Sequence, residues 1–296
     1  MAAMTFAKLY DRVRPEISAF LHQFTAEHIA DEKLREGCLH LLGRGKLIRP
    51  SALIASAKTF RPEISVNECI HAAAAIELVH TFTLVHDDLP ELDDAKLRRG
   101  VDAVHVKFGA ALALLVGDAL FNLAFAALQE APLADQNWRE KTLRELVDAV
   151  SGVIEGQVRE LALSGRDAAL KDIEEIERLK TASLFVCAIV CGAIIAGAES
   201  EQINAVREFA TLLGHAYQIK DDLISATGDV QTVGKSLEQD EVLERPTAVR
   251  LLGVKGARER FDEVNEQALG ALERLAEAAD TGLLRGLHKT LVAREK

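Results

Sequence analysis

Apolar residues recur along most of this chain at spacings of three and four, the period of an amphipathic α-helix. Glycines and prolines such as Gly43, Pro62 and Pro90 interrupt the pattern and mark the ends of helices. The pattern predicts helices over residues 6–30, 33–42, 49–59, 66–89, 104–128, 138–163, 172–197, 202–224 and from 246 onward. Because β-branched runs are scarce and no fixed period repeats, we expect a single all-α domain over residues 1–296.

Two stretches of the predicted helices are apolar on every side, which is also a property of membrane spans. Residues 184–198 are fewer than the roughly 20 that a span requires. Residues 110–128 are long enough, but Asp118 and Asn122 near their middle would be costly in lipid. Helices of this kind also form the centre of large soluble proteins. We therefore expect no membrane span, and a bundle of antiparallel helices around a central apolar cavity.

Composition narrows the class of protein further. The net charge of −11 argues against a nucleic-acid partner. The 4 cysteines are too few and too scattered for a disulfide framework. Cys187 and Cys191 lie one helical turn apart in an apolar stretch without an accompanying histidine, so we expect buried thiols. Free thiols and the lack of a signal-peptide pattern at the first residues predict a cytoplasmic protein.

The densest group of charges follows the apolar run of residues 72–85. Five carboxylates between Asp87 and Asp94 come directly before a pair of arginines, and the pair Asp221-Asp222 ends a similar stretch downstream. Carboxylates are the hard oxygen ligands that magnesium prefers, and arginine and lysine bind phosphate oxygens. The two clusters therefore predict a pocket in which a diphosphate is held through magnesium.

Other motifs allow competing interpretations. Glu77 and His80 form half of the Glu-x-x-His pattern of di-iron bundles, but no second copy occurs in the sequence. The loop of residues 229–240 has Thr232 and Val233 where a calcium loop needs oxygen ligands. The glycine-bearing loop of residues 43–50 could bring backbone amides and its basic side chains to an anion, although it lacks the full phosphate-loop spacing.

Taken together and in this order, the motifs resemble those of the trans-isoprenyl diphosphate synthases, specifically the bacterial short-chain type that makes farnesyl diphosphate. Residues 87–93 are similar to the first Asp-rich motif of the family in its longer form, residues 97–100 to the adjoining basic element, and residues 104–109 and 117–120 to the next helix. The resemblance covers essentially the whole chain. It implies the isoprenoid synthase fold and a magnesium-dependent, head-to-tail condensation of isopentenyl diphosphate with dimethylallyl or geranyl diphosphate. It also implies a homodimer.

The resemblance implies a role for each residue at a matching position. The diphosphate of isopentenyl diphosphate would be held by Gly45, Lys46, Arg49, His80 and Arg99. Three magnesium ions on the allylic diphosphate would be held by Asp87, Asp88, Asp93, Asp221 and Asp222. The same leaving group would be contacted by Arg98, Lys180, Lys235 and Arg245, the last standing where the family usually has lysine. Thr181 and Gln218 would lie beside the carbocation, which their oxygen dipoles can stabilise.

The chain also departs from the family pattern. Ser225 replaces the last aspartate of the second motif, Arg44 and Leu47 replace a glycine and an arginine, Glu160 replaces an aspartate, and residues 248–249 replace a Tyr-Pro pair. Since Asp221 is retained, we hypothesise that Ser225 weakens the enzyme without abolishing its activity.

Product length depends on a single aromatic residue. Phe82 lies five residues before Asp87, and an aromatic side chain there resembles the plug that stops chain growth at about fifteen carbons. A plain core phenylalanine would give the same pattern. Three alternatives to a farnesyl diphosphate synthase stay open: the same chemistry with a ten- or twenty-carbon product, a catalytically weakened or silent partner subunit, and a terpene cyclase on the same fold.

Overall fold

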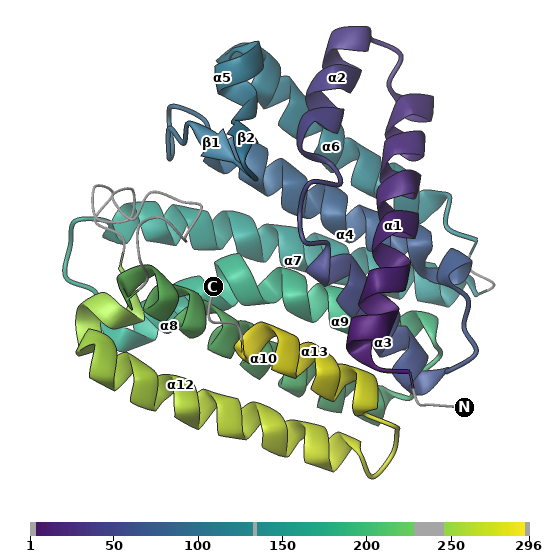
Figure 1. Cartoon of the computed structure of the whole chain (residues 1–296), viewed down its shortest axis with the longest axis vertical. Coiled ribbons are helices and arrows are strands. Elements are labelled where there is room, and N and C mark those ends of the chain that lie inside the picture. The colour runs from purple at the N-terminus through teal and green to yellow at the C-terminus, as the bar shows by residue number, and fades with distance from the viewer. Residues whose placement is uncertain (1–3, 133–134, 228–245, 294–296) are drawn as a thin grey trace.

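The computed structural model describes residues 4–132, 135–227 and 246–293, and nearly all of them lie in helices (Figure 1). The first half contains α1 (Phe6–His28), α2 (Glu32–Leu41), α3 (Ile48–Phe60), α4 (Val66–Asp87), the strands β1 (Leu97–Arg98) and β2 (Val101–Asp102), α5 (Val104–Phe108) and α6 (Ala110–Gln129). The second half contains α7 (Gln136–Leu163), α8 (Leu170–Glu177), the π-helix η1 (Arg178–Ala182), α9 (Ser183–Ile195), α10 (Ser200–Thr227), α12 (Ala248–Leu275) and α13 (Gly282–Val292).

Local sequence signals account for where the helices begin. Ser65 caps α4, because its hydroxyl accepts from the Glu68 amide while the Glu68 carboxylate accepts from the Ser65 backbone. Thr5 and Asp31 cap α1 and α2 through their side-chain oxygens. The all-α fold class predicted from the sequence is confirmed, and α1, α2, α3, α4 and α7 lie within a few residues of their predicted bounds.

Three predicted helices are interrupted in the structure, so the prediction of continuous helices was wrong there. Gly109 has a φ of 88° between α5 and α6, a conformation that ends the helix predicted over 104–128. The segment predicted over 172–197 contains the wider turn of η1. The helix predicted from 246 onward is divided into α12 and α13, and Gly253 with a φ of 71° kinks α12.

The core surrounds α9, in which every residue except Ser183 and Val186 is buried. This helix packs against α3, α7 and α10, and Figure 1 shows α7 and α9 in the middle of the bundle with α12 along one side. A Cβ atom at Gly192 would lie 2.2 Å from the Leu53 carbonyl oxygen, so glycine permits the close approach of α9 to α3. Each buried leucine or isoleucine contributes about 1.5–3 kcal/mol to folding.

All four cysteines are buried and free, as predicted. The sulfur atoms of Cys187 and Cys191 are 3.8 Å apart within α9, and burial raises the pKa of Cys38 and Cys69 to about 12. These thiols are therefore packing residues with little nucleophilic character.

By length and composition, three helical segments of the described residues could cross a membrane: Val66–Asp87, Ala110–Gln129 and Leu170–Ile195. The bundle buries 72% of the apolar window of the first and of the third. Only 44% of the window of α6 is buried, because Leu114 and Leu115 are exposed.

Candidate active site

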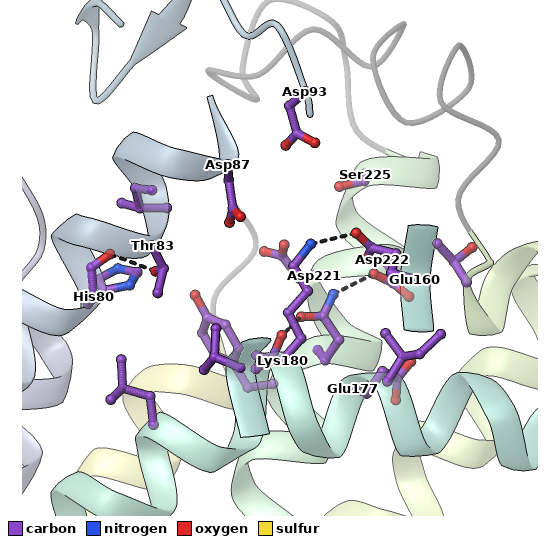
Figure 2. A pocket seen from close by; sticks show the side chains of 18 of the residues that line it. His80, Thr83, Asp87, Asp93, Glu160, Glu177, Lys180, Asp221, Asp222 and Ser225 are labelled. Atoms are coloured by element: carbon purple, nitrogen blue, oxygen red, sulfur yellow. Dashed lines mark hydrogen bonds and ion pairs between the residues drawn. The ribbon is translucent and has the colours of Figure 1, made fainter. Parts of the chain in front are cut away.

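A cavity of about 280 Å³ opens among α4, α7, η1 and α10 (Figure 2). Many of the residues predicted to carry the chemistry line it, namely Arg49, His80, Asp87, Asp93, Arg98, Lys180, Thr181, Gln218, Asp221 and Asp222. Its apolar lining residues are Leu84, Val153, Ile176, Leu184 and Pro246. Segments more than a hundred residues apart in the sequence thus contribute to one polar pocket with apolar walls.

One wall of the cavity is the C-terminal end of α4. His80, Thr83 and Asp87 share a face of this helix because they are spaced by three and four residues. The pKa of Asp87 is raised to about 6, chiefly by burial and also by the nearby carboxylates of Asp93 and Glu160, while Lys180 opposes the shift. The nearby basic side chains therefore do not fully offset the cost of burying the Asp87 carboxylate at the end of this apolar helix.

The opposite wall is α10, which presents Asp221, Asp222 and Ser225. Figure 2 shows these side chains on the far side of the cavity from Asp87. The Thr181 hydroxyl donates to Gln218 Oε1 at 2.8 Å, and Gln218 Nε2 donates to Asp222 Oδ1 at 2.8 Å. This chain of hydrogen bonds orients the Thr181 oxygen, whose lone pairs are not used by the bond it donates.

The base of the cavity is η1, which carries Lys180 and Thr181. Lys180 Nζ lies 2.5 Å from Glu160 Oε2 of α7. A Cβ atom at Gly156 would lie 2.7 Å from the Lys180 backbone nitrogen, so the glycine lets α7 approach η1 closely. A π-turn inserts one extra residue into a helix and often lies at a functional site.

Two arginines of the cavity are held by partners in the described residues. Arg49 Nη1 donates to His80 Nε2 at 3.2 Å, and its guanidinium lies 4.3 Å from the centre of the Phe185 ring. Arg98 Nε lies 3.0 Å from both carboxylate oxygens of Asp88, and a further contact of its Nη2 completes a bidentate pair. These pairs fix both guanidinium groups in place before any ligand binds.

Several predicted site residues do not line the described cavity. Asp88 is fully buried against Arg98, and burial raises its pKa. Arg99 Nη2 donates to Glu77 Oε1 at 2.8 Å, and a Cβ atom at Gly45 would lie 2.7 Å from the Arg99 guanidinium carbon. Gly45 therefore makes room for a buried ion pair.

The remaining predicted residues lie elsewhere. Lys46 is exposed in the loop before α3. Phe82 is buried and packs on Phe121 of α6 with ring centres 5.1 Å apart. Lys235 and Arg245 lie outside the described residues.

The carboxylates fit magnesium only together with a second ligand. Within the described ranges, no three histidine, cysteine or acidic side chains lie close enough to form a metal site by themselves. Asp87 and Asp93 instead stand across the cavity from Asp221 and Asp222. Magnesium in proteins is commonly bound by one or two carboxylates together with substrate phosphates and water, rather than by an all-protein cage. The donor set therefore fits magnesium that would be held by these carboxylates together with a diphosphate.

Comparison with known proteins identifies the family. A family model described as polyprenyl synthetase matches residues 31–281. The chain belongs to the polyprenyl synthetase family. It is 37% identical over 262 residues to farnesyl diphosphate synthase of Escherichia coli (strain K12), covering 86% of this chain and 87% of that protein. The resemblance drawn from the motifs is confirmed.

Solved structures confirm the isoprenoid synthase fold. An FPP/GFPP synthase from Zymomonas mobilis has a TM-score of 0.83 and 29% sequence identity, covering 97% of this chain and 99% of that one. A geranyltransferase from Helicobacter pylori, complexed with magnesium and isoprenyl diphosphate, has a TM-score of 0.80. At 24% identity it supports the fold alone.

The roles of three glutamates at the site of this polyprenyl synthetase were not predicted from the sequence. Glu77 was considered only as a metal ligand, whereas the structure makes it the buried partner of Arg99. Glu160 was noted as a departure, and its ion pair with Lys180 gives it a role. Nothing in the sequence indicated that Glu177 lines the cavity and contacts His215. The sequence did offer a signal for Glu77: it is a charged residue within the apolar run of residues 72–85, where a buried carboxylate needs a basic partner.

Proposed function

We propose that the cavity performs head-to-tail prenyl transfer, in which isopentenyl diphosphate is added to dimethylallyl or geranyl diphosphate. One observation carries the proposal: Asp87 and Asp93 face Asp221 and Asp222 across a single cavity that also contains Lys180. Two facing carboxylate pairs with a cation between them suit a diphosphate held through metal ions. A ligand that carries only one charge would leave most of these four carboxylates without a role.

The reaction requires stabilisation of separated charges. The allylic C–O bond breaks with its electron pair leaving on the diphosphate, the isopentenyl double bond attacks the resulting cation, and the adduct loses a proton to the departing diphosphate. Lys180 and Arg98 supply positive charge to the leaving group. Thr181, oriented by Gln218, directs an oxygen dipole at the cation. Leu84 and Leu184 exclude the water that would trap the cation as an alcohol.

Three magnesium ions would be held by the carboxylates of the two Asp-rich motifs, Asp87 and Asp93 with Asp221 and Asp222. Bound magnesium neutralises the diphosphate and makes it a better leaving group. Asp88 acts through Arg98, since its carboxylate is bidentate to that guanidinium. Lys235 and Arg245 are proposed to approach the same diphosphate, on the basis of the family resemblance alone.

The second substrate, isopentenyl diphosphate, would bind at the α3 side of the cavity. Arg49 and His80 stand there, 3.2 Å apart. Lys46 lies three residues before Arg49, in the loop before α3, and is exposed, so its flexible side chain can fold over an anion at the start of α3. Arg99 does not line the cavity, because its guanidinium pairs with Glu77 and packs against Gly45. A second diphosphate site distinguishes a transferase from a cyclase.

The product we propose is farnesyl diphosphate. Phe82 packs on Phe121, and Phe121 packs on Phe125 at 5.0 Å between ring centres, so three rings stand behind the α4 wall of the cavity. The neighbouring residues Thr83 and Leu84 line the cavity itself. A block of three aromatic rings beside the wall is well placed to limit the length of a growing prenyl chain.

We also propose a cytoplasmic homodimer without a membrane span. A line of exposed apolar residues runs along α7: Leu143, Val147, Ile154, Val158 and Leu161. Their spacings of four, seven, four and three place them on one face, the pattern of a helix that packs on a partner. Contiguous apolar surface on a water-soluble protein marks an interaction site. A second copy would cover this stripe without requiring lipid.

Release of inorganic diphosphate tests the proposal. Purified protein with magnesium is expected to release diphosphate from geranyl diphosphate only when isopentenyl diphosphate is also present. Release from the allylic substrate alone would indicate a cyclase. A silent partner subunit would release none and would not be stabilised by magnesium with a bisphosphonate.

A further inference from the structure

An imidazole–carboxylate pair joins two helices directly behind the cavity. Glu177 is the last residue of α8, and His215 lies on α10. His215 Nε2 is 2.9 Å from Glu177 Oε2, and the two side chains are 18% and 6% exposed. Glu177 also lines the cavity, as Figure 2 shows.

The carboxylate of Glu177 depends on this contact. Within the part of the chain that the structure describes, neither of its oxygens has a hydrogen bond of good geometry, and the polar side chain in contact with it is His215, at 2.9 Å. Burial raises the pKa of Glu177, and the His215 contact opposes that shift. Burying a carboxylate with so few polar partners costs stability, so its presence here suggests a role in fixing the local structure.

The pair adjoins the π-turn that carries the chemistry. η1 begins at Arg178, immediately after Glu177, and contains both Lys180 and Thr181. Three residues after His215, Gln218 accepts the hydrogen bond from Thr181. Two polar contacts from one face of α10, spaced by three residues, therefore reach the residue before η1 and the fourth of its five residues.

Close backbone packing leaves η1 little freedom to rearrange between these contacts. A Cβ atom at Gly214 would lie 2.6 Å from the Ala182 Cβ atom, so the glycine admits the end of η1 against α10. On the other side, Gly156 of α7 admits the Lys180 backbone. A π-turn is rare in helices, and its geometry here depends on how closely its neighbours pack against it.

We propose that His215 and Glu177 are positioning residues, which hold η1 in its π-turn so that Lys180 and Thr181 stay aimed into the cavity. This inference rests on the proposed prenyl transfer for its effect on rate. Neither residue is required to touch substrate. Loss of the pair allows η1 to relax towards a regular helix, which rotates Lys180 away from Glu160 and weakens its hold on the leaving group.

Five proteins test the proposal: wild type, His215→Leu, His215→Gln, the double variant Glu177→Leu with His215→Leu, and Arg207→Leu. Arg207→Leu is the matched control. Arg207 Nη2 lies 2.6 Å from Glu145 Oε1, so this ion pair also joins α10 to another helix, α7, but neither residue lines the cavity. His215→Gln retains an N–H donor for Glu177. The double variant removes the pair without leaving a buried carboxylate unpaired.

Two readouts are compared, amide hydrogen exchange over residues 178–183 and the steady-state constants. In His215→Leu we expect faster exchange at η1 and a kcat lowered about tenfold, the lower range for loss of an orienting partner. The KM for isopentenyl diphosphate should stay unchanged, since Arg49 and His80 lie on other helices. The double variant should be equally impaired, His215→Gln close to wild type, and Arg207→Leu unchanged in both readouts.

The proposal is overturned if exchange at η1 in His215→Leu equals that of wild type, or if the double variant recovers wild-type exchange and rate. Recovery would mean that only the unpaired charge was harmful. Absence of product from the wild-type protein would contradict the proposed prenyl transfer instead, while the exchange data would still decide whether the pair holds η1.

Discussion

Asp87 shows how a single residue sets the chemistry of the cavity. Its helix brings it to the end of an apolar run, where water is scarce, and Asp93 and Glu160 add negative charge nearby. The pKa of Asp87 is raised because burial and these neighbouring carboxylates disfavour its charged form, and a bound cation would stabilise that form. Below about pH 6, metal binding must therefore displace a proton from Asp87.

Magnesium affinity should therefore depend on pH. With an Asp87 pKa of about 6, we expect the affinity for magnesium with a diphosphate mimic to fall about tenfold per pH unit below that value. Without metal, the same shift makes the free energy of unfolding decrease as pH rises from about 4 to 6, because the unfolded chain releases this proton first.

Calorimetry of magnesium binding and denaturant unfolding between pH 4.5 and 8 check both trends. Asp87→Asn removes the titrating group, so its metal-free form should lose this contribution to the slope of stability with pH. An unchanged slope in that variant would show that another group is responsible.

Ser225 provides a second prediction at this scale. It lines the cavity one turn beyond Asp221, so Ser225→Asp would add a carboxylate to the α10 wall. We expect the rate at limiting magnesium to rise about 10-fold, within the range for restored outer ligand partners. Ala226→Asp adds the same charge to an exposed neighbour and should leave the rate unchanged. Equal rates for wild type and Ser225→Asp would refute the idea that Ser225 weakens the enzyme.

At the scale of elements, Phe82 on α4 and Phe121 on α6 meet behind the cavity. Removing the ring at 82 opens space between the two helices in the direction of Phe121 and Phe125. We expect Phe82→Ala to lengthen the product beyond fifteen carbons and to cost about 3–5 kcal/mol of stability. Phe20→Ala, in a separate aromatic cluster with Phe24, is the matched control. Unchanged product length in Phe82→Ala would exclude the plug.

The elements also show what a sequence can and cannot predict. The period of apolar residues located α1, α4 and α7 closely, because those helices bury one consistent face or are apolar throughout. The π-turn of η1 was not predictable, since it depends on Gly156 and Gly214 from two distant helices. Likewise, the pairing of Arg99 with Glu77 arises only when the β1–β2 hairpin folds back over α4.

At the scale of the whole molecule, the motif residues converge although the sequence separates them by more than a hundred positions. Asp87 and Asp221 meet because α4 and α10 both end at the same side of the central α9. The two carboxylate clusters predicted this convergence and the family resemblance supported it, whereas periodicity alone did not. The places of Asp88 and Arg99 outside the cavity lining were visible only in three dimensions.

Oligomeric state is a further prediction for the whole molecule. Val158 is 60% exposed in the apolar stripe of α7, so Val158→Asp should convert a dimer into a monomer. Val254→Asp places the same charge on an exposed apolar position of α12 and should leave the mass unchanged. Light scattering after size-exclusion chromatography distinguishes the two. A wild-type monomer, or a dimer that persists in Val158→Asp, would contradict this interface.

The central claim is that this cavity joins isopentenyl diphosphate to an allylic diphosphate. The most direct measurement incubates the protein with magnesium, labelled isopentenyl diphosphate and geranyl diphosphate, and sizes the extracted alcohols by chromatography. We predict a labelled fifteen-carbon product that disappears in Lys180→Ala. No labelled product from either geranyl or dimethylallyl diphosphate would contradict the account.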